Sequence, residues 1–526
     1  MKIGRFILPG LLVLLAALPI AFGPRGGEPA RDVRRVIIYT PHNEQIRFEF
    51  GRGFAAWHQR VHGGPAEVVW NTPGGTSEIR KILEANAEAA LRAGRPIGGN
   101  ADLVFGGGSY EYGQLKREIV LRTDGSGEGD ARRGRILDKP SLTPEWLASA
   151  YGENSVGGEP LYDPDGYWFG VALSGFGIVY NRDYLLSLGL QEPTEWADLA
   201  DARLAGAITL VNPSQSGSVT TALEAIIQRL GWERGWQIIL RMSANARSVA
   251  SSAPKVPLDV SAGDSAAGPS IDFYGRYQAQ AILDAGGGAR IGYIDPQGQT
   301  VIDPDPIALL SNAPNRETAE RFIAFALSDE GQALWQFRAK AEGGRARTDG
   351  ELGPHRFELR RMPVRRDFRA TYRDQFIDDV DPFALASKVE NPDRNARAFI
   401  APLFSAMCAD RRDELARAWD AIRTHPAYPV GTPLVTAADV DDPTLKAMLE
   451  AFDAMPDVAG PDGTRVSAAT REGRAAIRDG WIKGGWKAAG LWPEGASSID
   501  ELRRRFGAFH SAQYRRIVEL ARETGS

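Results

Sequence analysis

The chain has 526 residues, of which 43% are hydrophobic and 25% charged. This ordinary globular composition excludes a mainly disordered, a collagen-like or a polytopic membrane protein. The 62 Lys and Arg residues against 67 Asp and Glu give a net charge of -5 without a long block of like charges, which argues against nucleic acid as a partner. Cys408 is the one cysteine of the sequence, so an intramolecular disulfide and a multi-thiolate metal site are excluded.

The N-terminal residues follow the pattern of a secretory signal. Lys2 and Arg5 precede an apolar run from Phe6 to Phe22, and a Gly- and Pro-containing linker follows it. The run is also just long enough for a short membrane-crossing helix, so an uncleaved anchor is the alternative. We expect residues 1–27 to be a signal peptide or an N-terminal anchor plus linker, and the rest of the chain to be periplasmic or otherwise extracytoplasmic.

Strand and helix patterns alternate after the linker. Strand-like runs occur at 36–39 and 67–70, each followed by a loop and a helical pattern, and a third run at 101–105 ends in a Gly-rich loop. Later runs and helical patterns of the same kind lie at 167–173, 177–180, 206–230, 290–294, 307–310 and 315–335. This alternation predicts an α/β fold whose ligand-binding loops lie at the carboxyl ends of the strands.

The pattern of apolar and polar residues changes beyond residue 345. Helical patterns separated by Pro and Gly replace the alternation, with apolar residues such as Leu415, Trp419 and Ile422 at helical spacing. This predicts a mostly helical C-terminal region. In the preceding part, the Asp303-Pro304-Asp305-Pro306 segment is stiffened by its two prolines and suits a position beside a hinge, although a plain loop is an equal alternative.

Five segments carry a family resemblance that covers about residues 33–340. They are 36–42 (VIIYTPH), 101–107 (ADLVFGG), 176–181 (FGIVYN), 204–213 (LAGAITLVNP), and 307–315 (IALLSNAPN) with 324–332 (AFALSDEGQ). Together they resemble the extracellular solute-binding proteins of bacterial ABC importers, in the ferric-iron-binding-like branch of the type 2 periplasmic-binding-protein fold. The resemblance implies two α/β lobes joined by crossing strands, and a cleft that closes on a solute and delivers it to a membrane permease.

The resemblance also predicts the domain organisation. We expect mixed sheets flanked by helices in both lobes, with residues 33–172 and 291–345 forming lobe 1 and residues 173–290 forming lobe 2. Residues 346–526 are expected to form a mostly helical C-terminal extension, whose role the sequence leaves open.

Three loops that follow strands open helices with small or hydroxyl-bearing residues. The first helical turn has unpaired N–H groups and a partial positive charge, so such loops can hold an anionic oxygen. The alternative is that they are only N-caps and tight turns. The candidate ligand-binding residues of the loops are Gly74, Gly75, Thr76, Gly107, Gly108, Ser109, Ser214, Ser216, Gly217 and Ser218. The other candidates are Thr40, His42, Asn43, Ser174, Gly175, Asp272 and Tyr274.

His42 and Tyr274 are also candidate metal ligands. In the iron-binding relatives that the resemblance implies, a His, a Glu and two adjacent Tyr residues ligate Fe(III). Here His42 matches the first position, but Phe273 replaces one tyrosine and a glycine run occupies the Glu position, leaving Glu111 or Tyr277 as substitutes. Two of four ligands are missing, so an anionic organic or phosphate-bearing solute is favoured over direct iron ligation, with a chelated metal between those alternatives.

The sequence contains no Gly-x-Ser-x-Gly elbow, His-Glu-x-x-His motif or Walker loop. We therefore expect a monomeric, non-enzymatic receptor of an ABC importer, without a required cofactor, for a small anionic or chelated-metal solute; Fe(III) or another metal would be cargo. The alternatives are a membrane-anchored sensor on the same fold, an iron(III)-binding protein proper, and a hydrolase or transferase built in the cleft or tail. Iron, a phosphate-bearing compound, a polyamine and an organic acid all remain open as the solute.

Overall fold

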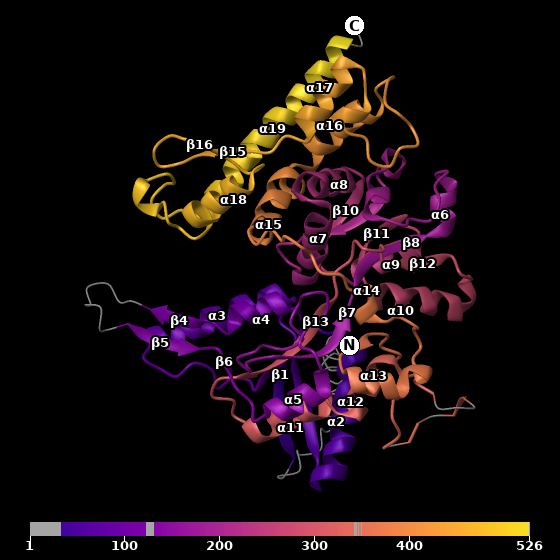
Figure 1. Cartoon of the computed structure of the whole chain (residues 1–526), viewed down its shortest axis with the longest axis vertical. Helices are drawn as coiled ribbons and strands as arrows, with labels where there is room; N and C mark the ends of the chain where they lie inside the picture. Colours follow the sequence, from indigo (N-terminus) through magenta and orange to yellow (C-terminus); the bar gives the residue numbers. More distant parts are fainter. Residues whose placement is uncertain (1–32, 122–130, 341–343, 346, 349, 525–526) are drawn as a thin grey trace, which may run out of the picture.

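A computed structural model describes residues 33–121, 131–340, 344–345, 347–348 and 350–524 (Figure 1). The predicted signal or anchor segment, residues 1–27, lies outside the described residues. Two separate sheets form the centres of two lobes, one in the lower and one in the upper half of the view in Figure 1. This confirms the predicted two-lobed α/β architecture.

The first lobe is built on a seven-stranded mixed sheet with the order β14-β7-β13-β3-β1-β2, in which β6 also pairs with β13. Its strands are β1 (Arg34–Tyr39), β2 (Ala66–Asn71), β3 (Leu103–Phe105), β6 (Leu137–Asp138), β7 (Phe169–Ser174), β13 (Asp303–Leu310) and β14 (Met362–Pro363). Strands β1, β2 and β3 run parallel, whereas β13 runs antiparallel to β3 and β7.

Alternating side chains of β13 bury both faces of this sheet. Ile307 and Leu309 pack in one core with α2, α11 and α12, whereas Ala308 and Leu310 pack in another with α3 and α4. The helices of this lobe are α2 (Glu44–His62), α3 (Thr76–Arg92), α4 (Ser109–Leu115), α5 (Pro144–Tyr151), α11 (Arg316–Ala326) and α12 (Asp329–Gln336), and β4 (Glu118–Leu121) pairs with β5 (Arg132–Arg135) in a hairpin.

The helix predicted over 315–335 is two helices. Helix α11 ends at Ala326, and the Ser328 side chain accepts a hydrogen bond from the Gly331 amide to begin α12. The N-cap residue has non-helical backbone angles, so it interrupts the helical pattern that the apolar spacing alone suggests.

The second lobe has a five-stranded sheet with the order β10-β9-β11-β8-β12. Its strands are β8 (Phe176–Asn181), β9 (Ile208–Val211), β10 (Ala246–Ala250), β11 (Ala267–Ile271) and β12 (Ile291–Ile294). Its helices are α6 (Arg182–Ser187), α7 (Gly217–Leu230), α8 (Trp232–Ala244), α9 (Lys255–Ala262) and α10 (Asp272–Ile282).

Three segments connect the lobes. Gly175 joins β7 to β8, residues 295–302 join β12 to β13, and residues 386–395 lead from α14 (Pro382–Leu385) to α15 (Ala396–Met407). The predicted return to lobe 1 at residue 291 is wrong by one strand, because β12 pairs with β8 in the second sheet. The chain returns to the first sheet only at Asp303.

The C-terminal region is divided between the lobes. Strand β14 pairs with β7, and α13 (Arg366–Tyr372) contacts α5, so its first part completes lobe 1. Its second part shares one hydrophobic core with the second lobe. That part contains α15, α16 (Arg412–Arg423), α17 (Pro443–Phe452), α18 (Arg471–Ile477) and α19 (Ser498–Thr524), with the hairpin β15 (Asp457–Ala459) and β16 (Arg465–Ser467).

A buried ion pair fastens this second part to the lobe. Arg241 of α8 is fully buried, and its Nη1 donates to Asp453 Oδ1 at 2.6 Å while its Nη2 donates to the Val435 carbonyl at 2.7 Å. Trp419 and Phe452 cover the guanidinium. A buried guanidinium depends on such partners because its removal from water is costly.

Replacing Asp453 by Ala should lower the free energy of unfolding by about 3–5 kcal/mol, because it leaves Arg241 buried without its carboxylate. Urea unfolding of the full chain measures this. Asp457→Ala is the matched control: Asp457 pairs with Arg465 on the surface at 3.4 Å, and its loss should cost no more than about 1 kcal/mol. Equal costs for the two substitutions would contradict the role given to the buried pair.

Candidate functional site

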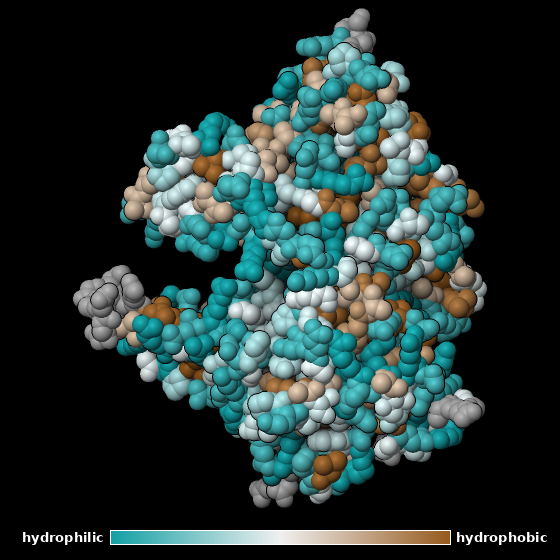
Figure 2. Space-filling model, in the orientation of Figure 1, coloured by the Kyte–Doolittle hydropathy of each residue, from teal (hydrophilic) through white to brown (hydrophobic). Residues whose placement is uncertain are grey.

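A large cavity lies between the lobes. Figure 2 shows a deep notch between the two halves. Residues of α4 and of the 157–168 segment, residues of α7, and residues of the third crossing segment line a cavity of about 780 Å³. Both lobes therefore contribute to one open cavity of the size that small-molecule sites usually have.

The three predicted loops meet across the lobes. A Cβ atom on Gly107 would lie 2.4 Å from Thr76 Cγ2, and one on Gly75 would lie 2.9 Å from the carbonyl oxygen of Gln215 in the second lobe. Gly217, at the start of α7, lies against Glu111 and Ser77 of the first lobe. The structure thus brings the three helix N-termini together beside the cavity.

A carboxylate of the protein itself occupies the place where these loops meet. Glu111 is 4% exposed; its Oε1 accepts from Ser77 Oγ at 3.0 Å and its Oε2 accepts from Arg80 Nε at 2.5 Å. The Glu111 side chain also lies next to the first residue of α7. An anionic solute at this point would meet the negative charge of Glu111, so the loop junction is a contact between lobes with its own internal anion.

Most of the predicted loop residues bond within their own turns. Asn43 Oδ1 caps α2, Ser216 Oγ caps α7, and the Thr40 hydroxyl accepts from the His42 amide. Ser216 and Ser218 join their hydroxyls at 3.1 Å, Ser214 bonds Asn212, and Glu78 binds the Gly75 amide and lies against Gly74. Ser109 is the predicted residue that lines the cavity, where its hydroxyl donates to Asp303 Oδ1 at 2.8 Å, and Gly108 lies against the same carboxylate.

A second polar cluster lies at the base of the crossing strands. His42 Nε2 and Asp305 Oδ2 are 2.8 Å apart, Arg361 Nη1 donates to Asp305 Oδ2 at 2.5 Å, and the Gly107 amide donates to Asp305 Oδ1 at 2.7 Å. Arg361 also donates to Ser174 Oγ at 2.8 and 3.0 Å, and its guanidinium stacks on Phe273. All these side chains are buried.

Electrostatics keeps the cluster in one charge state. Burial alone would raise the pKa of Asp305, but the charge of Arg361 and the hydrogen bonds from His42 and the Gly107 amide hold it below its usual value. Burial lowers the pKa of His42, and Asp305 offsets this only in part. Burial raises the pKa of Tyr274 to about 12, so its phenol is protonated at neutral pH. The cluster is therefore an Asp305 carboxylate held by a guanidinium and a neutral imidazole.

This arrangement bears on the predicted metal ligands. Among the described residues, no group of three or more His, Cys, Asp or Glu side chains is placed to hold a metal ion. The Arg361 guanidinium lies 3.3 Å from His42 Nε2, so a cation at His42 would meet a neighbouring positive charge. Glu111, a suggested substitute ligand, pairs with Ser77 and Arg80 instead.

The last two predicted residues belong to the hinge. The Gly175 amide donates to Asp272 Oδ2 at 2.9 Å, and a Cβ atom on Gly175 would lie 2.9 Å from Asp295 Oδ1, so a larger residue there would crowd the crossing. Burial raises the pKa of Asp272 to about 7. Asp272 therefore acts within the crossing segments.

Asp305 and Arg361 were missed as site residues. Asp305 lies in the stiff segment 303–306, which the sequence placed beside a hinge, and its carboxylate could have been singled out there. No sequence pattern pointed to Arg361 as a site residue, because it lies in the region predicted to be a separate C-terminal extension. The pairing of β14 with β7 brings it to the site.

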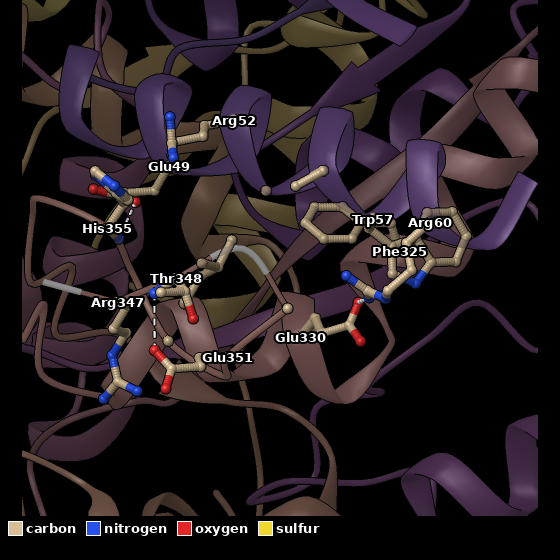
Figure 3. Close-up of a pocket in the computed structure, with 15 residues that line it drawn as sticks. Glu49, Arg52, Trp57, Arg60, Phe325, Glu330, Arg347, Thr348, Glu351 and His355 are labelled. Carbon is tan, nitrogen blue, oxygen red and sulfur yellow. Dashed lines mark hydrogen bonds and ion pairs between the residues drawn. The ribbon is translucent and has the colours of Figure 1, made fainter. Parts of the chain in front are cut away.

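A second pocket lies away from the cleft, between α2, α12 and residues 347–355 (Figure 3). Its volume is about 60 Å³, below that of usual solute sites. Glu49 accepts hydrogen bonds from the amides of His355, Arg356 and Phe357, and Arg60 pairs with Glu330 at 2.7 Å. These charged groups stabilise the fold of lobe 1.

Within the described part of the chain, no helix has the length and apolar character of a membrane span.

Comparison with known proteins finds similarity over part of the chain. Residues 144–340 match the family model of the bacterial extracellular solute-binding protein. A stretch of 170 residues is 30% identical to the phosphoglycerate transport regulatory protein PgtC of Salmonella typhimurium and covers 31% of this chain and 39% of PgtC. An uncharacterized protein of Haemophilus influenzae is 26% identical over 195 residues, which cover 37% of this chain and 54% of that protein.

Among solved structures, iron-bound HitA from Pseudomonas aeruginosa is similar with a TM-score of 0.46 and 17% identity, over 73% of this chain and 99% of HitA. The match to this chain covers 39% of the length of PgtC and 54% of the length of the Haemophilus protein, so the chain spans only part of these curated relatives.

The buried carboxyl group of Asp303 should make the free energy of unfolding depend on pH. Burial, and next the charge of Glu159, raise its pKa to about 7, so the fold favours the protonated carboxyl. Its stabilising contribution is present below about pH 4, the value for an exposed carboxyl, and is lost as the pH rises through about 7. Asp303→Asn should therefore flatten the decline in the free energy of unfolding between these values.

Urea unfolding at several pH values measures this. Asp272 shifts in the same direction, so part of the decline should persist in the variant. Asp264→Asn, at a residue exposed beside Arg247, should leave the wild-type profile unchanged. A profile in Asp303→Asn that follows the wild type at every pH would refute the assignment.

Proposed function

We propose that the chain is the extracytoplasmic receptor of an ABC importer, on the premise that residues 144–340 match the family model of the bacterial extracellular solute-binding protein. It closes two lobes on one small, anionic solute in the interlobe cavity and delivers it to a membrane permease. The matched family is one of binding proteins, and we propose no catalytic step.

The observation that carries this proposal is the cavity of about 780 Å³ with walls from both lobes. A solute there contacts α4 and Asp303 on one side and α7 on the other. Such a solute favours the closed arrangement, because only that arrangement offers it both walls. The single-residue crossing at Gly175 is suited to act as a hinge.

Two features support an anionic solute over a metal ion. The guanidinium of Arg361 lies beside His42, the residue for which the family resemblance implies a metal-ligand role. No carboxylate and imidazole cluster for a metal occurs among the described residues. In addition, the matched Salmonella relative is named for the transport of phosphoglycerate, an organic anion. A chelated metal bound through an anionic chelator is the alternative cargo.

A specific observation favours a second function. The name of PgtC describes a regulatory protein of transport. A sensor that closes on the same solute and signals to a partner protein would use the same cavity and hinge. Sequencing the mature N-terminus and co-purification from membranes separate the two: a receptor released from the membrane supports the importer role, and a retained anchor supports the sensor.

Native mass spectrometry of freshly purified full-length chain tests the binding function, because tight receptors retain their solute. We expect a small bound molecule, and small-angle scattering should show a smaller radius of gyration with it than after its removal by partial unfolding and refolding. A chain that carries no molecule and keeps one radius with every solute offered would refute the proposal.

Tyr110 offers a variant for the closed arrangement. Its ring, on α4 of lobe 1, lies 4.0 Å from the guanidinium of Arg397 on α15, which packs with the second lobe. Tyr110→Ala removes this contact between the lobes and should weaken binding of the retained solute by about 2- to 5-fold, measured by calorimetry, as expected for a cation–π pair whose aromatic ring is partly exposed. Tyr110→Phe keeps the ring face and should bind like the wild type. A loss in the Phe variant equal to that in the Ala variant would assign the effect to the hydroxyl instead.

A further inference from the structure

We propose that the third crossing segment, residues 386–395, is part of the solute site and that its Lys388 and Arg394, with Arg229 of α7, bind the anionic group of a small hydroxylated anion. The hydroxyls of this solute face Asp303 and Glu159 on the opposite wall. The proposal rests on the proposed function, because it assigns the substrate class of the same cavity.

The crossing segment forms a wall of the cavity and is fixed to lobe 2. Its Lys388 and Arg394 line the cavity, as does Arg397 of α15. The Asp393 amide and carbonyl exchange hydrogen bonds with the Gln228 side chain at 2.8 and 2.9 Å, and the Asp393 carboxylate pairs with Arg474 at 2.6 Å. The segment lies outside residues 144–340, so this wall is an addition to the matched domain.

Several charges of the cavity are already neutralised. Arg397 pairs with Glu224 at 2.6 Å, and Lys116 pairs with Asp163 at 2.6 Å. Each of these two ion pairs has no net charge, so neither pair favours an anionic over a cationic solute. The selection falls to the charged groups that remain.

Three cations of the cavity form no ion pair among the described residues: Arg229, Lys388 and Arg394. Burial lowers the pKa of Arg229, and the charge of Glu159 offsets this only in part. Arg229 donates to the hydroxyl and carbonyl oxygens of Ser387, and its buried Nε has no partner in the described part of the structure. Lys388 and Arg394 are exposed to the cavity opening. An anionic group between them would gain charge-assisted hydrogen bonds without breaking an existing ion pair.

Asp303, Glu159 and the exposed Glu390 form no ion pair in the described structure. Burial raises the pKa of Glu159, and the charges of Arg397 and Arg229 offset this in part, whereas the charge of Glu159 adds to burial in raising the pKa of Asp303. A carboxylate oxygen accepts a hydrogen bond from a hydroxyl group, and a protonated carboxyl group can also donate one. A solute with an anionic group at one end and hydroxyls at the other therefore matches the two walls.

The loop junction is not an alternative anion site in this structure. Glu111 already supplies the negative charge there, and Arg80, its cationic partner, also holds both oxygens of Glu84 at 2.8 Å. The unpaired cations of the cavity lie instead on α7 and on the third crossing segment.

The test uses the full chain, wild type and a Lys388→Gln/Arg394→Gln double variant, with Arg234→Gln as the control. Arg234 is an exposed cation of α8 outside the cavity, so this variant changes the charge of the same lobe without touching the wall. Native mass spectrometry identifies the retained molecule. Calorimetry then uses glycerol 3-phosphate and 3-phosphoglycerate as anionic probes, with glycerol and spermidine as the neutral and cationic probes.

We expect a retained hydroxylated anion or measurable binding of an anionic probe, and a loss of at least about tenfold in affinity in the double variant but not in Arg234→Gln. A retained polyamine or metal ion, or equal affinity in all three proteins, overturns the proposal while leaving the solute-binding function standing. Absence of any retained molecule and of binding to every probe overturns both. Thermal unfolding of the double variant close to that of wild type shows that a loss in binding is not a loss of fold.

Discussion

The buried carboxylate of Asp305 is the interaction that holds together the edge of the first lobe beside the crossing strands. It lies near the start of β13, the strand by which the chain returns from the second lobe, and it binds the β1 loop through His42, the β3 loop through the Gly107 amide, and the β14 edge through Arg361. Removal of a carboxylate from water is costly, and these three donors offset that cost. The same bonds fix where the first lobe ends and the crossing begins.

Glu111 sets a second constraint, because it decides what the converging loops can bind. Helix N-termini attract anions, and here the anion comes from α4 of the same chain. The loops then act as a polar contact between the lobes, and the space for a solute lies farther along, between α4, α7 and the third crossing segment. Because Glu111 occupies the loop junction, the helix N-termini there are already paired with a carboxylate. The interlobe cavity is the separate place that has room for a solute.

Much of the fold followed from patterns that are local in the sequence. The alternating side chains of β13 and the apolar spacing of α11 are consequences of backbone geometry, and such patterns sufficed to predict an α/β fold. The division into two lobes was implied by the family resemblance. The return point at Asp303 and the membership of β14 in the first sheet depend on strand pairing between distant segments, which spacing does not encode. Likewise, the candidate loops were visible as glycines and serines, whereas Glu111 as their internal anion required the packing of α4 against α7.

The third crossing segment has a consequence for closure. Because Asp393 is held by Gln228 of α7 and by Arg474, and Ser387 by Arg229, most of the segment should move with the second lobe. The unpaired cations Arg394 and Lys388 would then travel with α7, whereas Asp303 and Ser109 stay with the first lobe. A solute that joins an anionic group to hydroxyls must bridge these two bodies to satisfy both ends. Such a solute binds fully only when the lobes are close. Its affinity is therefore higher for the closed arrangement than for the open one, and this difference is what drives closure of a hinged receptor.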